Sequence, residues 1–127
     1  MIIEEALVSR LIAQVALVGG RVYPMLLPPS VTLPAITYQK ISSVRAYTHD
    51  GFAHYAEPRF QVSAWATTYA GAKAIQTQVK TALEAYVGMM GGGVDVQRCL
   101  VANEIDLYDP ESRIYHQAVD YILAHAE

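Results

Sequence analysis

The chain has 127 residues, of which 53% are hydrophobic and only 17% charged, and its net charge is −3. This length suits one domain over residues 1–127, and the single cysteine, Cys99, excludes an internal disulfide and a cysteine-based metal site. The nine lysines and arginines form no basic run, which argues against a DNA-gripping surface, and no stretch reaches the roughly 18 apolar residues of a membrane-spanning helix.

The first predicted element is an amphipathic helix over residues 3–18. Its apolar residues recur at spacings of three and four, as they do on one face of a helix. They are Ile3, Leu7, Leu11, Val15 and Val18. Gly19 and Gly20 follow and predict the helix end. Residues 21–23 are predicted as a short strand or an extended link, and the prolines after them predict an irregular loop over residues 24–33.

A long antiparallel hairpin is predicted next. Residues 35–44 are rich in β-branched and aromatic side chains, and residues 59–66 alternate between apolar and polar. Between them, Asp50 and Gly51 form a strong turn signal. Tyr47, Phe52 and Tyr55 then lie in an extended tip, where exposed aromatic residues are typical interface anchors. The alternative is equally well supported: the tip folds back onto its own sheet, and these aromatic residues pack there instead of at an interface.

The second half of the chain repeats the pattern of a helix followed by two strands. Residues 68–87 predict a helix whose polar face carries Lys73, Gln76, Lys80 and Glu84, and the glycine-rich residues 88–93 predict a mobile connector. Residues 94–107 and 115–123 predict strands, the first with a bulge, joined by a turn at Asp109-Pro110. The order α-β-β-α-β-β predicts an α+β fold, with a mostly antiparallel sheet of about four strands and two helices packed on it.

No pattern of residues indicates catalysis or a cofactor. His49, Asp50 and His54 share the hairpin tip and offer metal-ligand chemistry, but they match no metal-binding spacing, so exposed polar residues are the favoured interpretation. Cys99 lies in an apolar run and is expected to be buried and inert. The acidic residues near the last turn, Glu104 among them, are interpreted as solvated. The sequence therefore predicts no catalytic, cofactor or metal site.

Four segments in a fixed order carry a resemblance to a known family. They are LVGGRVYP at 17–24, LPAITYQKI at 33–41, RFQVSAWATTY at 59–69 and YDPESRIYH at 108–116. Together with the two predicted helices, they resemble the tail-completion, or tail-terminator, proteins of long-tailed phages and prophages over nearly the whole chain. In the resemblance Gly20, Pro34 and Trp65 are fold determinants, and no catalytic residue is carried over.

The resemblance implies a structural virion protein at the head–tail junction, assembled in the cytoplasm of the bacterial host. A hexameric ring of small α/β subunits would cap the finished tail tube, stop its polymerisation and join the tail to the head. Its partners would be other copies of the chain, the tail-tube protein and a head-completion or connector protein, and DNA would pass through the lumen without specific binding. No membrane partner is implied.

The hairpin tip corresponds to a variable loop of that family, which contacts the tube or a neighbouring subunit. The interface candidates are therefore Tyr47, His49, Asp50, Phe52, His54 and Tyr55. The alternatives are a head-completion or connector component, a small metal-binding enzyme that uses the tip histidines, and a cytosolic ligand-binding domain.

Overall fold

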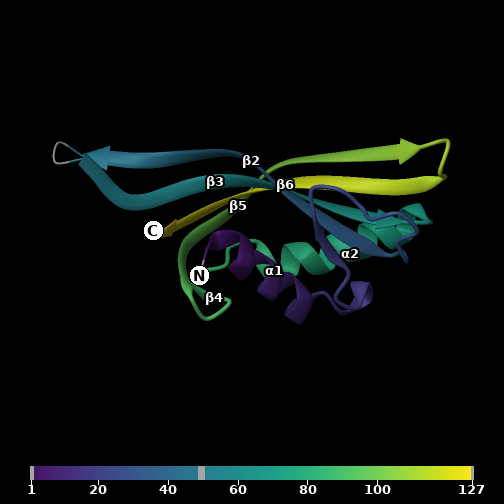
Figure 1. Ribbon diagram of the computed structural model, residues 1–127, viewed down its shortest axis with the longest axis horizontal. Helices are drawn as coiled ribbons and strands as arrows, with labels where there is room; N and C mark the ends of the chain where they lie inside the picture. The colour runs from purple at the N-terminus through teal and green to yellow at the C-terminus, as the bar shows by residue number, and fades with distance from the viewer. Residues whose placement is uncertain (1, 49–50, 127) are drawn as a thin grey trace.

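The computed structural model describes residues 2–48 and 51–126 (Figure 1). In chain order its elements are the helix α1 (Ile3–Gln14), the 3-10 helix η1 (Ala16–Val18), the strands β1 (Val22–Pro24), β2 (Ala35–Thr48) and β3 (Gly51–Ala66), the helix α2 (Tyr69–Leu83), and the strands β4 (Gly88–Met90), β5 (Val94–Asp109) and β6 (Ile114–Ala126). None of the described helices is long and apolar enough to cross a membrane.

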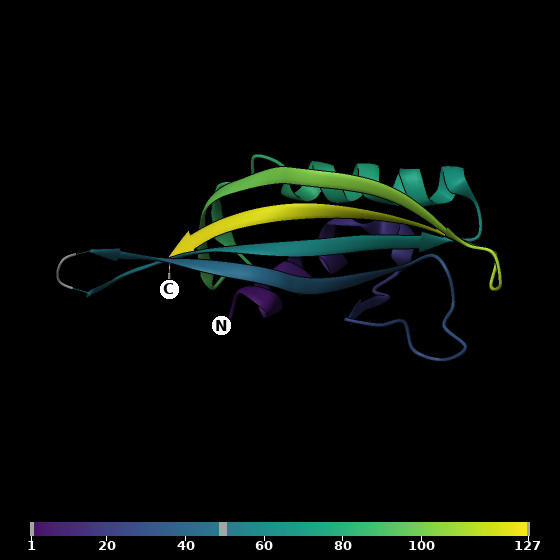
Figure 2. The ribbon, with the colours of Figure 1, turned by 90° about the horizontal axis from the view of Figure 1, so that it is seen from above.

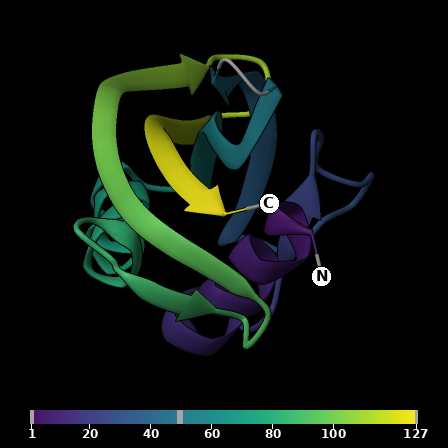
Figure 3. The same ribbon diagram turned by 90° about the vertical axis from the view of Figure 1, so that its left-hand side faces the viewer.

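The strands form one six-stranded mixed sheet in the order β1-β2-β3-β6-β5-β4. β1 runs parallel to β2 and the other neighbours are antiparallel. The sheet curls into a half-barrel, as the end-on view in Figure 3 shows. The prediction of a mostly antiparallel four-stranded sheet in the order α-β-β-α-β-β is therefore wrong, because the chain follows α-β-β-β-α-β-β-β.

Two short strands explain this difference: residues 21–23 were predicted as a short strand or an extended link outside the sheet, and β4 was not predicted. β1 and β4 have three residues each, too few to show the alternation of apolar and polar residues that identifies a strand. β4 lies in the segment predicted as a mobile connector, yet Met90 is fully buried there and pairs with Val94. Both short strands border the sheet, where brief pairing is enough to cover part of an edge.

The two helices lie on one face of the sheet and enclose the core between themselves and the strands (Figure 1). The helix predicted at residues 3–18 is present, with its last residues as a 3-10 turn, and Gly19 ends it in the left-handed region at φ 54°. Fully buried side chains such as Leu7 and Leu11 each stabilise the fold by about 1.5–3 kcal/mol. Helix α1 also contacts β1 and β4, the two outermost strands, so the sheet wraps around it.

The predicted hairpin is confirmed and is longer than expected. β2 and β3 pair from Ala35 opposite Trp65 to Thr48 opposite Gly51, with register shifts after Lys40 and Arg45. β6 pairs with β3 only from Tyr55 onward, so the end of the hairpin projects beyond the sheet. It lies at one end of the molecule, and the β5–β6 turn lies at the other (Figure 1).

Local capping explains where α2 begins and where the last turn forms. The Thr68 hydroxyl oxygen accepts a hydrogen bond from the Gly71 N–H at 3.0 Å, which caps α2. In the β5–β6 turn, the Asp109 carboxylate accepts hydrogen bonds from the Ser112 hydroxyl and the Glu111 N–H, at 2.8 and 3.0 Å, which hold the pKa of Asp109 below its usual value. The predicted bulge in β5 is present as two register shifts.

Candidate assembly surfaces

The hairpin tip was the predicted interface, and the structure describes part of it. Tyr47 pairs with Phe52 across the hairpin, and His54 lies in β3 next to Tyr55. The Tyr55 hydroxyl donates a hydrogen bond to Glu57 Oε1 at 3.1 Å. His49 and Asp50 lie outside the described residues. The predicted metal site that combines them with His54 therefore also falls outside the part of the chain that the structure describes. The contacts predicted for the tip remain predictions.

The face of the sheet opposite the helices has no helix packed on it and carries a polar centre. The Arg59 guanidinium donates two hydrogen bonds to Asp120 Oδ2, at 2.7 and 3.1 Å, and Gln61 donates to Asp120 Oδ1 at 3.2 Å. Asp120 is buried, because these side chains cover it. Such a paired and hydrogen-bonded carboxylate is satisfied within the chain and offers no free acid or base.

The same face is apolar along β5. Leu100, Ile105 and Leu107 are each 45–46% exposed. Leu107 lies opposite His116, which in turn lies opposite Trp65. Exposed apolar side chains in a row on a sheet face are a typical feature of protein–protein contact surfaces.

Two edges of the sheet are open over most of their length. β1 covers β2 only at residues 36–38, and β4 covers β5 only at residues 94–96. The Ala85 N–H also donates a hydrogen bond to the Cys99 main-chain oxygen at 3.0 Å. Beyond these contacts, residues 39–48 and 100–109 pair on one side only among the strands that the structure describes. The two open edges lie on opposite sides of the four long strands, with the loop after β1 beyond β2 and helix α2 beyond β5 (Figure 2). An open strand edge is a template for pairing with another chain.

An open groove beside α1 exposes further apolar surface. It has a volume of about 740 Å³, and Val8, Ile12, Ala13 and Tyr38 are among the residues that line it. Ile12 is exposed there. Glu4 lies at its rim and forms an ion pair with Lys40 at 3.0 Å.

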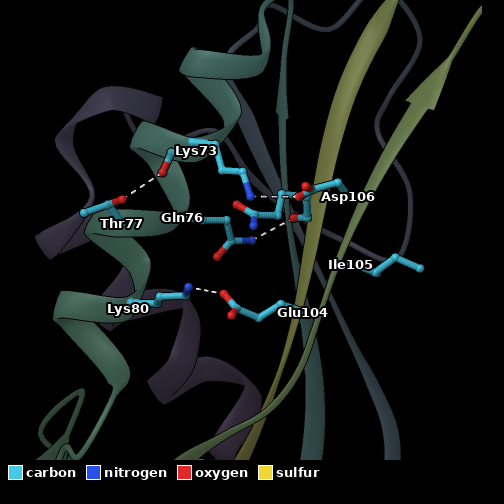
Figure 4. Close-up of a pocket in the computed structure, with 8 residues that line it drawn as sticks. Lys73, Gln76, Thr77, Lys80, Glu104, Ile105 and Asp106 are labelled. Carbon is cyan, nitrogen blue, oxygen red and sulfur yellow. Dashed lines mark hydrogen bonds and ion pairs between the residues drawn. The ribbon is translucent and has the colours of Figure 1, made fainter.

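A polar cleft of about 250 Å³ separates α2 from β5 and β6 (Figure 4). Its mouth carries two ion pairs, Lys73 with Asp106 at 3.0 Å and Lys80 with Glu104. The hydrogen bonds from Lys73 and from the Tyr69 hydroxyl hold the pKa of Asp106 below its usual value. The two acidic residues were predicted to be solvated, and the structure shows them exposed but paired with lysines.

Gln76 forms the floor of this cleft and joins α2 to the sheet. It was predicted on the polar, solvent-facing side of the helix, and that prediction is wrong, because only 1% of Gln76 is exposed. Its amide nitrogen donates to the main-chain oxygens of Val62 and Gln117, both at 2.8 Å. Gln76 lies four residues from Ala72 and three from Val79, which places it within the apolar stripe of α2. This spacing could have predicted from the sequence that Gln76 is buried.

The remaining candidate groups show no reactive arrangement. Cys99 is fully buried as predicted, and burial raises the pKa of its thiol to about 12, which disfavours the reactive thiolate. Among residues 2–48 and 51–126, no three histidine, cysteine, aspartate or glutamate side chains come together as a metal site.

Comparison with known proteins gives a family match and structural matches. A family model described as "Tail completion protein gp17" matches residues 5–125. Among solved structures, a chain of the "Virion of native gene transfer agent (GTA) particle" is similar to this protein, with a TM-score of 0.77 and 16% sequence identity, and the match covers 97% of this chain and 94% of that chain. At this identity the likeness shows a shared fold. No curated protein matches the chain.

Proposed function

Because the chain belongs to the tail completion protein gp17 family, we propose that its copies assemble into a ring, with six the expected number, that caps the finished tail tube and ends its polymerisation. The protein is a structural component of a phage-type tail and therefore of the virion. The ring would also join the tail to a head-completion or connector protein. Its role is structural and involves no catalysis.

The observation that carries this proposal is the pair of open edges on opposite sides of one sheet, along β2 and β5. A contact between two different surfaces of the same chain is heterologous, and it closes into a ring when the rotation between copies allows. Because both edges belong to one rigid sheet, the angle between them is fixed by the curl of that sheet. The exposed row of Leu100, Ile105 and Leu107 lies next to the β5 edge and would be covered in such an assembly.

Several further features support this proposal. The core draws residues from α1, α2 and the strands up to β6, so residues 1–127 would act as one domain in each copy. The projecting β2–β3 hairpin, with Tyr47, Phe52 and Tyr55, can reach the tube protein or a neighbouring copy. The net charge of −3 favours a lumen through which DNA passes without specific binding.

Two measurements test the proposal. Native mass spectrometry and analytical ultracentrifugation, with and without the tail-tube protein, should detect a closed oligomer. Electron microscopy of particles that lack this protein should show overlong or headless tails. A chain that remains monomeric under both conditions, and tails of normal length without it, would count against the ring. Binding to a head-side portal or adaptor instead of the tube would favour a head-completion role.

A further inference from the structure

The polar cleft between α2 and β5 contains buried hydrogen-bond acceptors that have no donor. Gln76 is 1% exposed and Gln117 is 5% exposed, and their side-chain oxygens accept no hydrogen bond from any residue that the structure describes. The side-chain amide of Gln76 cannot adopt the flipped orientation, because its nitrogen must face the two main-chain oxygens to which it donates hydrogen bonds. Its oxygen therefore stays turned away from the sheet (Figure 4).

These acceptors specify the chemistry of a ligand. A buried acceptor without a donor is unfavourable, so a group that fills the cleft must supply N–H or O–H donors. The carboxylates of Glu104 and Asp106 at the mouth are paired with Lys80 and Lys73, so the lining has no net charge and the amide oxygens select the ligand by hydrogen bonding. A guanidinium group has five donors in a flat fork and can bind several such oxygens at once. The volume of about 250 Å³ has room for the end of an arginine side chain.

Among the residues that the structure describes, one arginine side chain has no hydrogen-bond or ion-pair partner. Five of the six arginines are engaged within the chain: Arg10 with the Ala82 main-chain oxygen, Arg21 with the Pro34 main-chain oxygen, Arg59 with Asp120, Arg98 with Glu57, and Arg45. Within residues 2–48 and 51–126 the structure gives the Arg113 side chain no hydrogen bond or ion pair.

Arg113 is presented at the projecting end of the β5–β6 hairpin. Its N–H donates to the Asp109 main-chain oxygen at 2.8 Å, and its φ of 57° is in the left-handed region, so the turn fixes its position. It lies four residues from Gln117 along an extended strand, roughly 13 Å. The rings of Tyr108 and Tyr115, which pair across the hairpin next to this turn, pack together with their centroids 4.6 Å apart. The Arg113 side chain is exposed at this turn and is accessible to a neighbouring copy.

We propose that Arg113 of one copy inserts its guanidinium group into the cleft of the neighbouring copy, where it binds the side-chain oxygens of Gln76 and Gln117. This inference rests on the proposed ring and names one of its contacts. A projection and a receptor on the same chain make a heterologous contact, as a ring requires. The guanidinium donors and the acceptors of Gln76 and Gln117 are complementary in hydrogen bonding.

Mixed single substitutions test this contact directly. Thr77 lines the cleft and is exposed, so Thr77→Cys places a thiol at its mouth. A mixture of the Arg113→Cys and Thr77→Cys proteins, with tail-tube protein present, should form a disulfide-linked dimer that contains one chain of each. Each variant alone, and the wild type with only the buried Cys99, should form no such dimer.

Association measurements provide the second test. Arg113→Ala should weaken self-association by at least about tenfold in sedimentation experiments, and Arg113→Lys should fall between it and the wild type because lysine keeps the charge but lacks the fork. The matched control is Arg10→Ala, which removes the same charge from α1, outside both open edges and the cleft, and should leave association unchanged.

The outcomes separate this contact from the ring itself. If the wild type assembles while the mixed dimer is absent and Arg113→Ala assembles as well as the wild type, the Arg113 contact is wrong, the cleft holds only water, and the ring proposal stands. If the wild type stays monomeric both alone and with tube protein, the proposed ring fails and the contact fails with it.

Discussion

The indole ring of Trp65 stacks on the imidazole ring of His116, with the ring centroids 3.9 Å apart and the planes 16° from parallel. The two residues are directly paired neighbours on β3 and β6. The indole N–H also donates to Thr37 Oγ1 on β2 at 2.9 Å. Trp65 therefore ties three strands together on the face away from the helices, and it is half-buried there.

Replacing Trp65 with alanine should lower the free energy of unfolding by about 2 kcal/mol. A fully buried tryptophan would lose about 3–5 kcal/mol, but this side chain is only partly buried. Urea denaturation of Trp65→Ala measures the loss. Trp65→Phe keeps the stacking and loses only the hydrogen bond to Thr37, so it should lose about 1 kcal/mol. Equal losses in the two variants would show that stacking on His116 contributes nothing.

The stability of the fold should decrease in mild acid because of His116. Burial lowers the pKa of His116 below its unfolded value of 6.5. Between those two pKa values the unfolded chain binds a proton that the folded chain does not, so stability is lost as the pH falls from 6.5 and is fully present above it.

Urea midpoints of the wild type and of His116→Gln, each measured at about pH 7.5 and about pH 5.5, test this pH dependence. The wild type should lose more stability between the two values, because glutamine does not titrate. The other histidines contribute equally to both proteins. An equally steep decrease in the variant would assign the effect to them.

Gln76 should be among the most sensitive polar positions. Gln76→Glu places a carboxylate against the main-chain oxygens of Val62 and Gln117 and should be strongly destabilising, whereas Gln76→Met removes only the donor and should cost about 1–3 kcal/mol. The exposed Thr81→Ala, one turn further along α2, should change stability by less than about 0.5 kcal/mol. Thermal and urea denaturation of the three variants rank them, and a neutral Gln76→Glu would contradict the observed contacts.

The long elements could be predicted from the sequence because their patterns extend over many residues. The stripe of Ile3, Leu7 and Leu11 identified α1, and the alternation around Phe60 and Val62 identified β3. The pairing of β1 and β4 could not be found in this way, since strands of three residues are too short to show a pattern and β4 lies in a glycine-rich segment.

The polar cleft could not be predicted for a related reason. Lys73 and Lys80 look like solvated helix residues, and Glu104 and Asp106 look like part of an acidic turn. Only the packing of α2 on β3 and β6 places these four residues opposite one another. Gln76 had a local signal, because it lies within an apolar stripe, but its two main-chain partners are 14 and 41 residues away.

The two phenylalanines of the chain, both in β3, offer a matched test of the projecting hairpin. Phe60 is fully buried in the core, so Phe60→Ala should lower the free energy of unfolding by about 3–5 kcal/mol. Phe52 pairs with Tyr47 beyond the point where β6 begins to cover β3, so Phe52→Ala should leave stability nearly unchanged and weaken assembly with other copies or with tube protein.

Differential scanning calorimetry and sedimentation of both variants separate these effects. A sharp drop in the melting temperature of Phe52→Ala would place the tip in the core instead of at an interface, whereas normal folding and normal assembly would remove it from the set of contact residues.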